Sequence, residues 1–307
     1  MSPTLPALDD TLGAMEIGIV LGTFLFGLLT LQTFNYFRTY TQDTLMLKTL
    51  VGVVWGLELA HSISGWHSVY EITVTFSGQQ AYILDPPHSI VLMVLFSGVL
   101  TMVVETFFAF RVRNLSGRWL ITVICSILNV LALIFSIILV VIFWRGNGFP
   151  ILREKQNLWI VATASCVVPA TNILVAISLC YYLWKIHQDQ AEFVKTRTMV
   201  VTLIVWTAET TIMTSVMSIM QVILFVARDD LVWGTFFLLH AKLLSNCMLA
   251  SLNGRQRFHS QTEVIIADST ATNNHSVSVI RMNRMGDTSD NRVKETPVGG
   301  SSGESSF

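Results

Sequence analysis

Residues 119–144 read WLITVICSILNVLALIFSIILVVIFW, a stretch without a single charged side chain. A helix of about 20 apolar residues is long enough to cross the hydrocarbon core of a bilayer. Within that core, only helices and closed barrels can pair all of their backbone polar groups. Barrel strands alternate in polarity from one residue to the next, whereas this stretch is almost continuously apolar. It therefore predicts a membrane-spanning helix.

Six other apolar runs, separated by short polar loops, have the same character. Of the 307 residues, 52% are hydrophobic and 13% charged, against about 25% charged residues in soluble domains. We expect an all-α polytopic membrane protein, a seven-transmembrane helix bundle over residues 15–253, in the lipid bilayer of the plasma membrane or an endomembrane. The net charge of −1 predicts no nucleic-acid partner. The predicted spans are Met15–Phe37, Leu45–Tyr70, His88–Val112, Trp119–Trp144, Leu158–Trp184, Thr198–Ala227 and Leu231–Asn253.

The cationic residues of the loops predict the orientation, because cytoplasmic loops carry an excess of Lys and Arg. With the N-terminus outside, the inner side carries Arg38, Lys48, Arg111, Arg113, Arg118, Lys185, Lys195, Arg197, Arg255 and Arg257. The outer side carries only Arg145, Arg153, Lys155 and Arg228. We therefore expect residues 1–14 to form a short segment outside and the C-terminus to lie in the cytosol.

The two ends of the chain differ in composition from the bundle. No Lys or Arg occurs in the first 37 residues, so the basic region of a cleaved signal peptide is missing and the first span should be retained. Residues 254–307 are rich in Ser, Thr and Asn and nearly lack aromatic residues. Such a segment buries too little apolar surface to fold, and we expect a disordered cytosolic tail.

A few ionisable residues interrupt the apolar spans. A charge at the centre of a spanning helix costs about 2.5 to 3.5 kcal/mol on insertion scales, so it usually faces the bundle and finds a partner. Lys242, Glu58 and Glu209 all fall near the middle of their spans. We expect Lys242 to pair with Glu58 or Glu209, with His61 and Asn246 completing a buried polar cluster. The cluster serves either as a structural ion pair or as a ligand or proton site.

Other features of the spans concern helix shape and packing. Pro169 should kink its helix, and Asn172 is placed to bond a carbonyl group freed by the proline. Gly18-x-x-x-Gly22 and Gly52-x-x-x-Gly56 permit close approach of backbones. We interpret them as close packing of the first two helices, with a homodimer as the alternative.

The chain resembles a family of basidiomycete fungal seven-helix membrane proteins known only as domain of unknown function 6534. In the last span the resemblance is carried by Lys242-Leu-Leu-Ser-Asn246 and by Leu249-Ala-Ser-Leu-Asn-Gly-Arg255. Elsewhere it is carried by Gly27, Leu31-Gln-Thr33, Tyr36, Tyr40, Asp43, Leu47-Lys48, Trp55, His61, Phe107-Phe-Ala-Phe-Arg-Val112 and Ala176-Ile-Ser-Leu-Cys-Tyr181. The resemblance implies the fold and the membrane location, and it implies no activity.

Function is therefore predicted mainly by exclusion. The chain contains no glycine-rich phosphate loop, no metalloprotease His-Glu-x-x-His and no Gly-x-Ser-x-Gly elbow. We expect no enzyme, no catalytic residue, no cofactor and no metal. The leading hypothesis is a receptor-like protein that senses a small or lipophilic ligand and contacts a cytosolic partner through its inner loops and tail. The alternatives are a transporter or channel built on the Glu/Lys cluster, and a structural membrane scaffold.

Overall fold

The fold is all-α over the residues that can be described. A computed structural model describes residues 12–77, 87–117, 119–145, 154–189, 212–228 and 230–254, and every regular element in these ranges is helical. Seven helices occur in this part of the chain, and the helical class expected from the sequence is confirmed. Residues 198–211 of the sixth predicted span and the tail beyond Gly254 lie outside the described residues.

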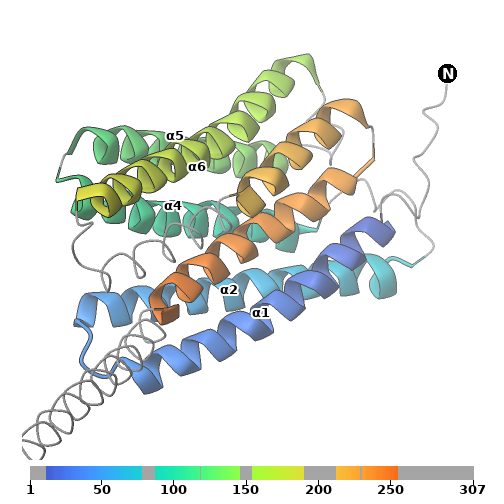
Figure 1. Cartoon of the computed structure of the whole chain (residues 1–307). Coiled ribbons are helices and arrows are strands. Elements are labelled where there is room, and N and C mark those ends of the chain that lie inside the picture. Colours follow the sequence, from blue (N-terminus) through green and yellow to red (C-terminus); the bar gives the residue numbers. More distant parts are fainter. Residues whose placement is uncertain are drawn as a thin grey trace, which may run out of the picture. The chain divides into compact units, whose positions relative to one another are not determined.

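Figure 1 shows the helices in the order in which they follow one another along the chain. The long helix α2 continues into a short π-helical turn, η2. After Gly117, which ends α4 with a φ of 64° in the left-handed region that glycine adopts without strain, α5 begins almost at once. The bounds are α1 Ala14–Thr39, α2 Leu45–Tyr70, η2 Glu71–Thr75, α4 His88–Ser116, α5 Trp119–Arg145, α6 Lys155–Asp189, and then the helices Ile212–Ala227 and Val232–Gly254.

Six of the described helices are long and apolar enough to cross a membrane. These helices expose large apolar side chains, which would be unfavourable in water. In a membrane, lipid covers these side chains. The chain is thus a helical integral membrane protein. The remaining described helix, Ile212–Ala227, is apolar but shorter, and it is the described part of the predicted sixth span.

The last helix, Val232–Gly254, lies at the centre of the bundle. Its most apolar 18-residue window has a mean hydropathy of 1.3 and is 56% buried, whereas the corresponding window of α5 has a mean hydropathy of 2.9 and is 11% buried. A helix that faces protein rather than lipid can carry polar side chains, because neighbouring helices supply their partners. The central helix is therefore the one in which buried polar chemistry is expected.

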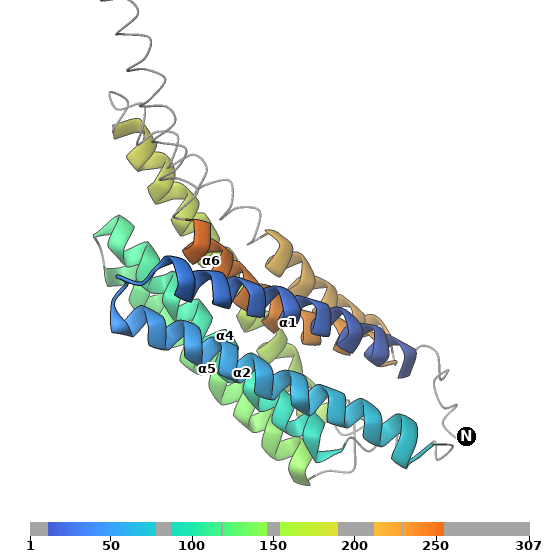
Figure 2. The ribbon, with the colours of Figure 1, turned by 90° about the horizontal axis from the view of Figure 1, so that it is seen from below.

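The other helices pack around it in sequence order. α4 contacts α2, α5 and α6, while α1 contacts α2 and α5 contacts α6. Figure 2, a view from below, shows α1 and the last helix running alongside each other. The main apolar core joins α1, α2, α4 and the last helix and includes Leu29, Val51, Leu100 and Met248. The end of the bundle where α1 and the last helix begin is called the Met15 end, and the opposite one is called the Asn253 end.

Polar side chains of the last helix also bond to the backbone of α1. Each bonded pair is separated by 221 residues in the chain, so the two helices are parallel and keep one register. The spacings of 7 and 11 residues along each helix are close to whole turns, which places all three donors on one face. The bonds run from Thr235 Oγ1 to the Ala14 carbonyl (2.6 Å), from Asn246 Nδ2 to Leu25 (3.1 Å) and from Asn253 Nδ2 to Gln32 (2.8 Å).

The glycines of α1 serve this same contact, which corrects the interpretation drawn from the sequence. A Cβ at Gly18 would lie 3.3 Å from Thr235, and one at Gly22 would lie 2.9 Å from Lys242. Both partners belong to the last helix and not to α2. At Gly52 and Gly56 a Cβ would meet nothing within 4 Å. Close packing of α1 and α2 through paired glycines was therefore the wrong explanation, because the backbone of α1 approaches a different neighbour.

Candidate functional site

Lys242 forms a buried ion pair with Glu58. Its Nζ donates to Glu58 Oε2 at 3.1 Å and to Ser62 Oγ at 2.7 Å. The Lys242 and Glu58 side chains are 6% and 1% exposed. The contact joins the centre of α2 to the centre of the last helix, and a charge pair so deep in the bundle is costly unless hydrogen bonds complete it. Ser62, one turn beyond Glu58 on the same face of α2, supplies that second bond and was not singled out from the sequence.

The surroundings of Lys242 are built by α1. Gly22 leaves room for the aliphatic part of the lysine, since a Cβ there would touch its Cε at 2.9 Å. The Phe26 ring lies 5.6 Å from Nζ, within the range in which a ring face attracts a cation. Lys242 of the last helix therefore contacts two other helices. α1 packs against its aliphatic part, and α2 supplies the opposite charge of Glu58.

Asn246 lies one turn from Lys242 but binds backbone atoms. Its Nδ2 donates to the Leu25 carbonyl at 3.1 Å and to the Lys242 carbonyl at 2.8 Å. The amide thus holds the last helix against α1 beside the ion pair. It acts as the interhelical contact that such amides often provide in membranes.

His61 faces a small cavity beside the ion pair. It is 1% exposed, and neither ring nitrogen has a hydrogen-bond partner among the described residues. Both His61 and Lys242 line a space of about 240 Å³, part of it open to the surroundings, between α1, α2, α4 and the last helix. The structure therefore brings Glu58, His61, Lys242 and Asn246 together, whereas Glu209 lies outside the described residues.

The proline helix holds a second polar contact. α6 continues through Pro169 to Asp189, and Asn172 Nδ2 lies 3.3 Å from His240 Nε2. The Asn172 amide is thus engaged with the last helix and not, as we expected, with a carbonyl freed by the proline. His240 is 5% exposed and lies two residues before Lys242. We did not single out His240 from the sequence, although its position in the polar last helix could have indicated a buried role.

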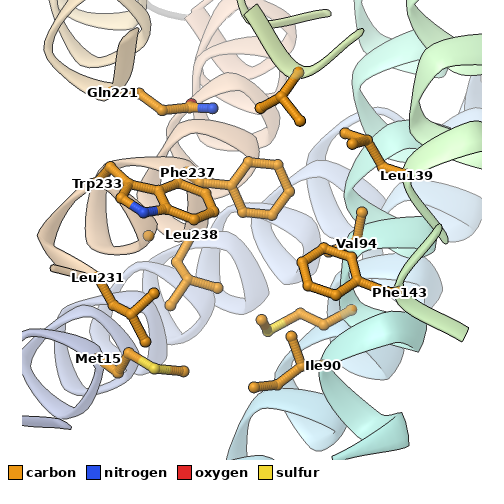
Figure 3. Close-up of a pocket in the computed structure, with 13 residues that line it drawn as sticks. Met15, Ile90, Val94, Leu139, Phe143, Gln221, Leu231, Trp233, Phe237 and Leu238 are labelled. Carbon is orange, nitrogen blue, oxygen red and sulfur yellow. The ribbon is translucent and has the colours of Figure 1, made fainter. Parts of the chain in front are cut away.

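A larger cavity, here called the apolar cavity, lies at the Met15 end of the bundle (Figure 3). It encloses about 690 Å³ of space free of atoms, part of it open to the surroundings. Phe143 of α5 faces Trp233 and Phe237 of the last helix across it. Gln221 contributes the one amide side chain of its described lining. The full described lining is Met15, Ile90, Met93, Val94, Leu139, Phe143, Val161, Gln221, Leu231, Trp233, Gly234, Phe237 and Leu238.

The apolar cavity connects to the ion pair through the last helix. Leu238 lines both the apolar cavity and the small cavity beside Lys242, and Met93 of α4 does the same. A molecule held against Leu238 is thus one helical turn from Lys242. Among the described residues, no group of three or more His, Cys, Asp or Glu side chains could hold a metal ion.

In a comparison with known proteins, part of the chain matches a family without an assigned activity. Residues 169–257 match the model of a family described as "Family of unknown function (DUF6534)". No curated protein and no solved structure matches the chain. The match begins at Pro169 and contains Asn172, His240, Lys242 and Asn246, so it covers the part of the bundle that supplies most of the buried polar contacts.

Polar residues at the end of α1 and in the turn after it contact the end of this matched region. Tyr40 Oη donates to the Asn253 carbonyl at 2.9 Å, and Asn253 donates to Gln32. Tyr36 Oη donates to Asp43 Oδ2 at 2.8 Å, which holds the turn between α1 and α2. These polar residues near the end of α1 thus stabilise the turn and the helix contacts at the Asn253 end.

Proposed function

We propose that this protein is a non-catalytic, receptor-like membrane protein that binds a small lipophilic ligand in the apolar cavity. The observation that carries the proposal is the lining of that cavity, which is aromatic and aliphatic and has Gln221 as its amide. Binding sites for small molecules are concave and mostly apolar, with few polar groups that fix orientation. The residues come from α1, α4, α5, α6 and both later helices, so an occupant would touch most of the bundle.

The same proposal assigns a direction to the signal. The bias of basic residues predicts that the Met15 end lies outside, where a ligand would enter, and that the Asn253 end lies in the cytosol, where a partner would bind. The last helix runs from the cavity past the Glu58–Lys242 pair to the Asn253 end. A ligand changes a protein's state only if it binds two conformations with different affinity, and an element that reaches both ends can carry that difference.

Filling the apolar cavity tests the proposal. A Cβ at Gly234 meets nothing within 4 Å, although the residue lines the cavity, so Gly234→Phe can place a ring there without striking the backbone. Gly56→Phe is the matched control, because Gly56 also has open space but lies on α2, outside the lining. The probes are 6-phenylhexan-1-ol, decanol and farnesol, added to the full-length protein in nanodiscs.

The expected result is a rise in melting temperature of the wild-type protein and of Gly56→Phe with at least one probe. A ligand that binds only the folded state stabilises it by about 2.7 kcal/mol at 100 times its Kd. Gly234→Phe should melt normally and show no response. If no probe stabilises the wild-type protein more than Gly234→Phe, ligand binding in this cavity is refuted and the scaffold hypothesis takes its place.

A second measurement separates a receptor from a passive binder. In a variant without its four native cysteines, a fluorophore on Gln42→Cys, between α1 and α2 at the Asn253 end, should change its emission when the stabilising probe is added. The same fluorophore should not respond in Gly234→Phe. Binding without any change at Gln42 would leave a lipid-binding protein and remove the receptor role.

A further inference from the structure

A second cavity adjoins the apolar one, deeper in the bundle. It shares Leu139, Gln221 and Phe237 with the apolar cavity, and it encloses about 610 Å³ of space free of atoms, part of it open to the surroundings. Its lining differs in character, because side chains with polar atoms project from several helices. These are Ser97, Thr101, Ser136, Ser218, Gln221 and His240. We call it the polar cavity.

Glu105 lies one turn beyond the polar cavity on α4. It is 2% exposed, and neither carboxyl oxygen has a hydrogen-bond partner among the described residues. The residue is four positions from Thr101 and seven from Gly98, both of which line the polar cavity, so it shares their face of the helix. The Cα–Cβ bonds of a helix tilt toward its N-terminus, which directs Glu105 toward Thr101.

Asn129 stands opposite Glu105 across the contact of α4 and α5. A Cβ at Gly98 would lie 2.7 Å from the Ser136 Cβ, so these two positions face each other. Because α4 and α5 are antiparallel, seven residues after Gly98 on α4 and seven residues before Ser136 on α5 lead to Glu105 and Asn129. Asn129 is 1% exposed, and neither atom of its amide has a partner among the described residues. Such unsatisfied groups are rare in folded proteins and call for an explanation.

The charge of Glu105 has no counterpart nearby in the described bundle. A carboxylate enclosed by protein in a membrane needs an opposite charge or hydrogen bonds. Lys242, the cation of the described interior, is already bound to Glu58 at 3.1 Å. The described residues thus offer no free cation to Glu105, and a ligand with a positive group is one that could pair with it.

We propose that the two cavities together bind a lipophilic amine. Its apolar body occupies the apolar cavity, and its protonated amino group enters the polar cavity, where hydroxyl groups and Glu105 accept its hydrogen bonds. Seven residues of helix, about 10 Å, separate Val94 in the first lining from Thr101 in the second. The amine should carry its charge at about that distance from its apolar centre. This inference rests on the proposed function, because it assumes that the apolar cavity binds a ligand.

Two probes of equal shape test the inference. 6-Phenylhexylamine and 6-phenylhexan-1-ol differ only in the head group, and the amine is protonated at pH 7. Their Kd values are measured with the full-length protein in nanodiscs, corrected for partitioning into empty nanodiscs. The variants are Glu105→Gln, which removes the charge and keeps the shape, and Glu16→Gln, a control at an exposed position in the first turn of α1.

The amine should bind the wild-type protein and Glu16→Gln at least about tenfold more tightly than the alcohol, a difference of about 1.4 kcal/mol. In Glu105→Gln the two probes should bind equally, with the alcohol unchanged, which also shows that the variant is folded. Equal binding of both probes to the wild-type protein would overturn the inference and leave the proposed function intact. Binding of neither would refute both. Stabilisation by NaCl with no amine preference would mark Glu105 as an inorganic cation site and also overturn the inference.

Discussion

Lys242 and Glu105 are two buried ionisable residues of one bundle that differ in their interaction partners. Each lies almost wholly inside the protein. Lys242 has Glu58 and Ser62 as partners, whereas Glu105 has none among the described residues. The first is what a structural ion pair requires. The second is the arrangement that leaves a group available to a ligand or a proton.

The ion pair gives a stability prediction at the residue scale. Lys242→Met leaves the Glu58 carboxylate buried without its cation, and removing one partner of such a pair costs about 3 to 5 kcal/mol. We expect a markedly lower melting temperature in detergent and lower yield of folded protein. The measurement is thermal unfolding of purified full-length protein followed by tryptophan fluorescence.

Two further variants make this prediction specific. Lys185→Met removes a lysine from the exposed end of α6 and should leave the melting temperature nearly unchanged. Glu58→Gln combined with Lys242→Met should recover part of the loss, because the remaining amide carries no charge. A Lys242→Met protein that melts with the wild type would show that the pair contributes nothing to stability.

The contact between α1 and the last helix is the feature that matters at the element scale. Three side-chain bonds in constant register and two glycines place these parallel helices close together. Interhelical hydrogen bonds in membranes average only about 0.6 kcal/mol each. Tight packing against Gly18 and Gly22 must therefore supply much of the attraction, since lipid offers no hydrophobic drive for helices to associate.

Two alanine substitutions in α1 separate packing from helix propensity. Gly22→Ala puts a methyl group against Lys242 at 2.9 Å, and overpacking of this kind costs about 1 to 3 kcal/mol. Gly27→Ala, in the same helix, meets nothing within 4 Å. It should be neutral or more stable, because alanine favours a helix over glycine by up to about 1 kcal/mol.

The comparison is made by unfolding both variants in parallel with the wild type. The expected order of melting temperatures is Gly22→Ala below wild type, with Gly27→Ala equal to or above it. Equal destabilisation of both variants would mean that α1 is sensitive to any loss of glycine. The close approach of α1 to the last helix would then make no specific contribution to stability.

At the scale of the whole molecule, the orientation in the membrane can be tested directly. In a variant without its four cysteines, Gln42→Cys lies between α1 and α2, and Ser77→Cys follows η2 at the other end of the bundle. With the N-terminus outside, a membrane-impermeant maleimide should label Ser77→Cys in intact cells. Gln42→Cys should react only after permeabilisation.

The labelling experiment includes its own control, since each cysteine reports on the opposite side. The reverse pattern would invert the orientation and place the Met15 end, where the apolar cavity lies, on the cytosolic side. The proposed ligand would then have to be an intracellular molecule. Labelling of both positions from outside would contradict a membrane span in α2.

Much of the architecture could be predicted from the sequence, because lipid imposes a simple rule on the chain. The apolar stretch 119–144 had to be a helix, since its backbone groups can pair only with one another in hydrocarbon. The same rule marked Lys242 and Glu58 as residues in need of partners. These inferences concern one helix and its solvent at a time, and composition and periodicity are enough for them.

Which helices touch was decided only by the tertiary structure. Gly18 and Gly22 mark a close contact in the sequence, but their partner could be any helix, and it is the last one rather than α2. Asn172 could bond locally or across the bundle, and it contacts His240. The two cavities arise where side chains from five or more helices meet, and Glu105, next to one of them, has no partner among the described residues. Residues far apart in the chain share no periodicity, so only packing in three dimensions could bring them together.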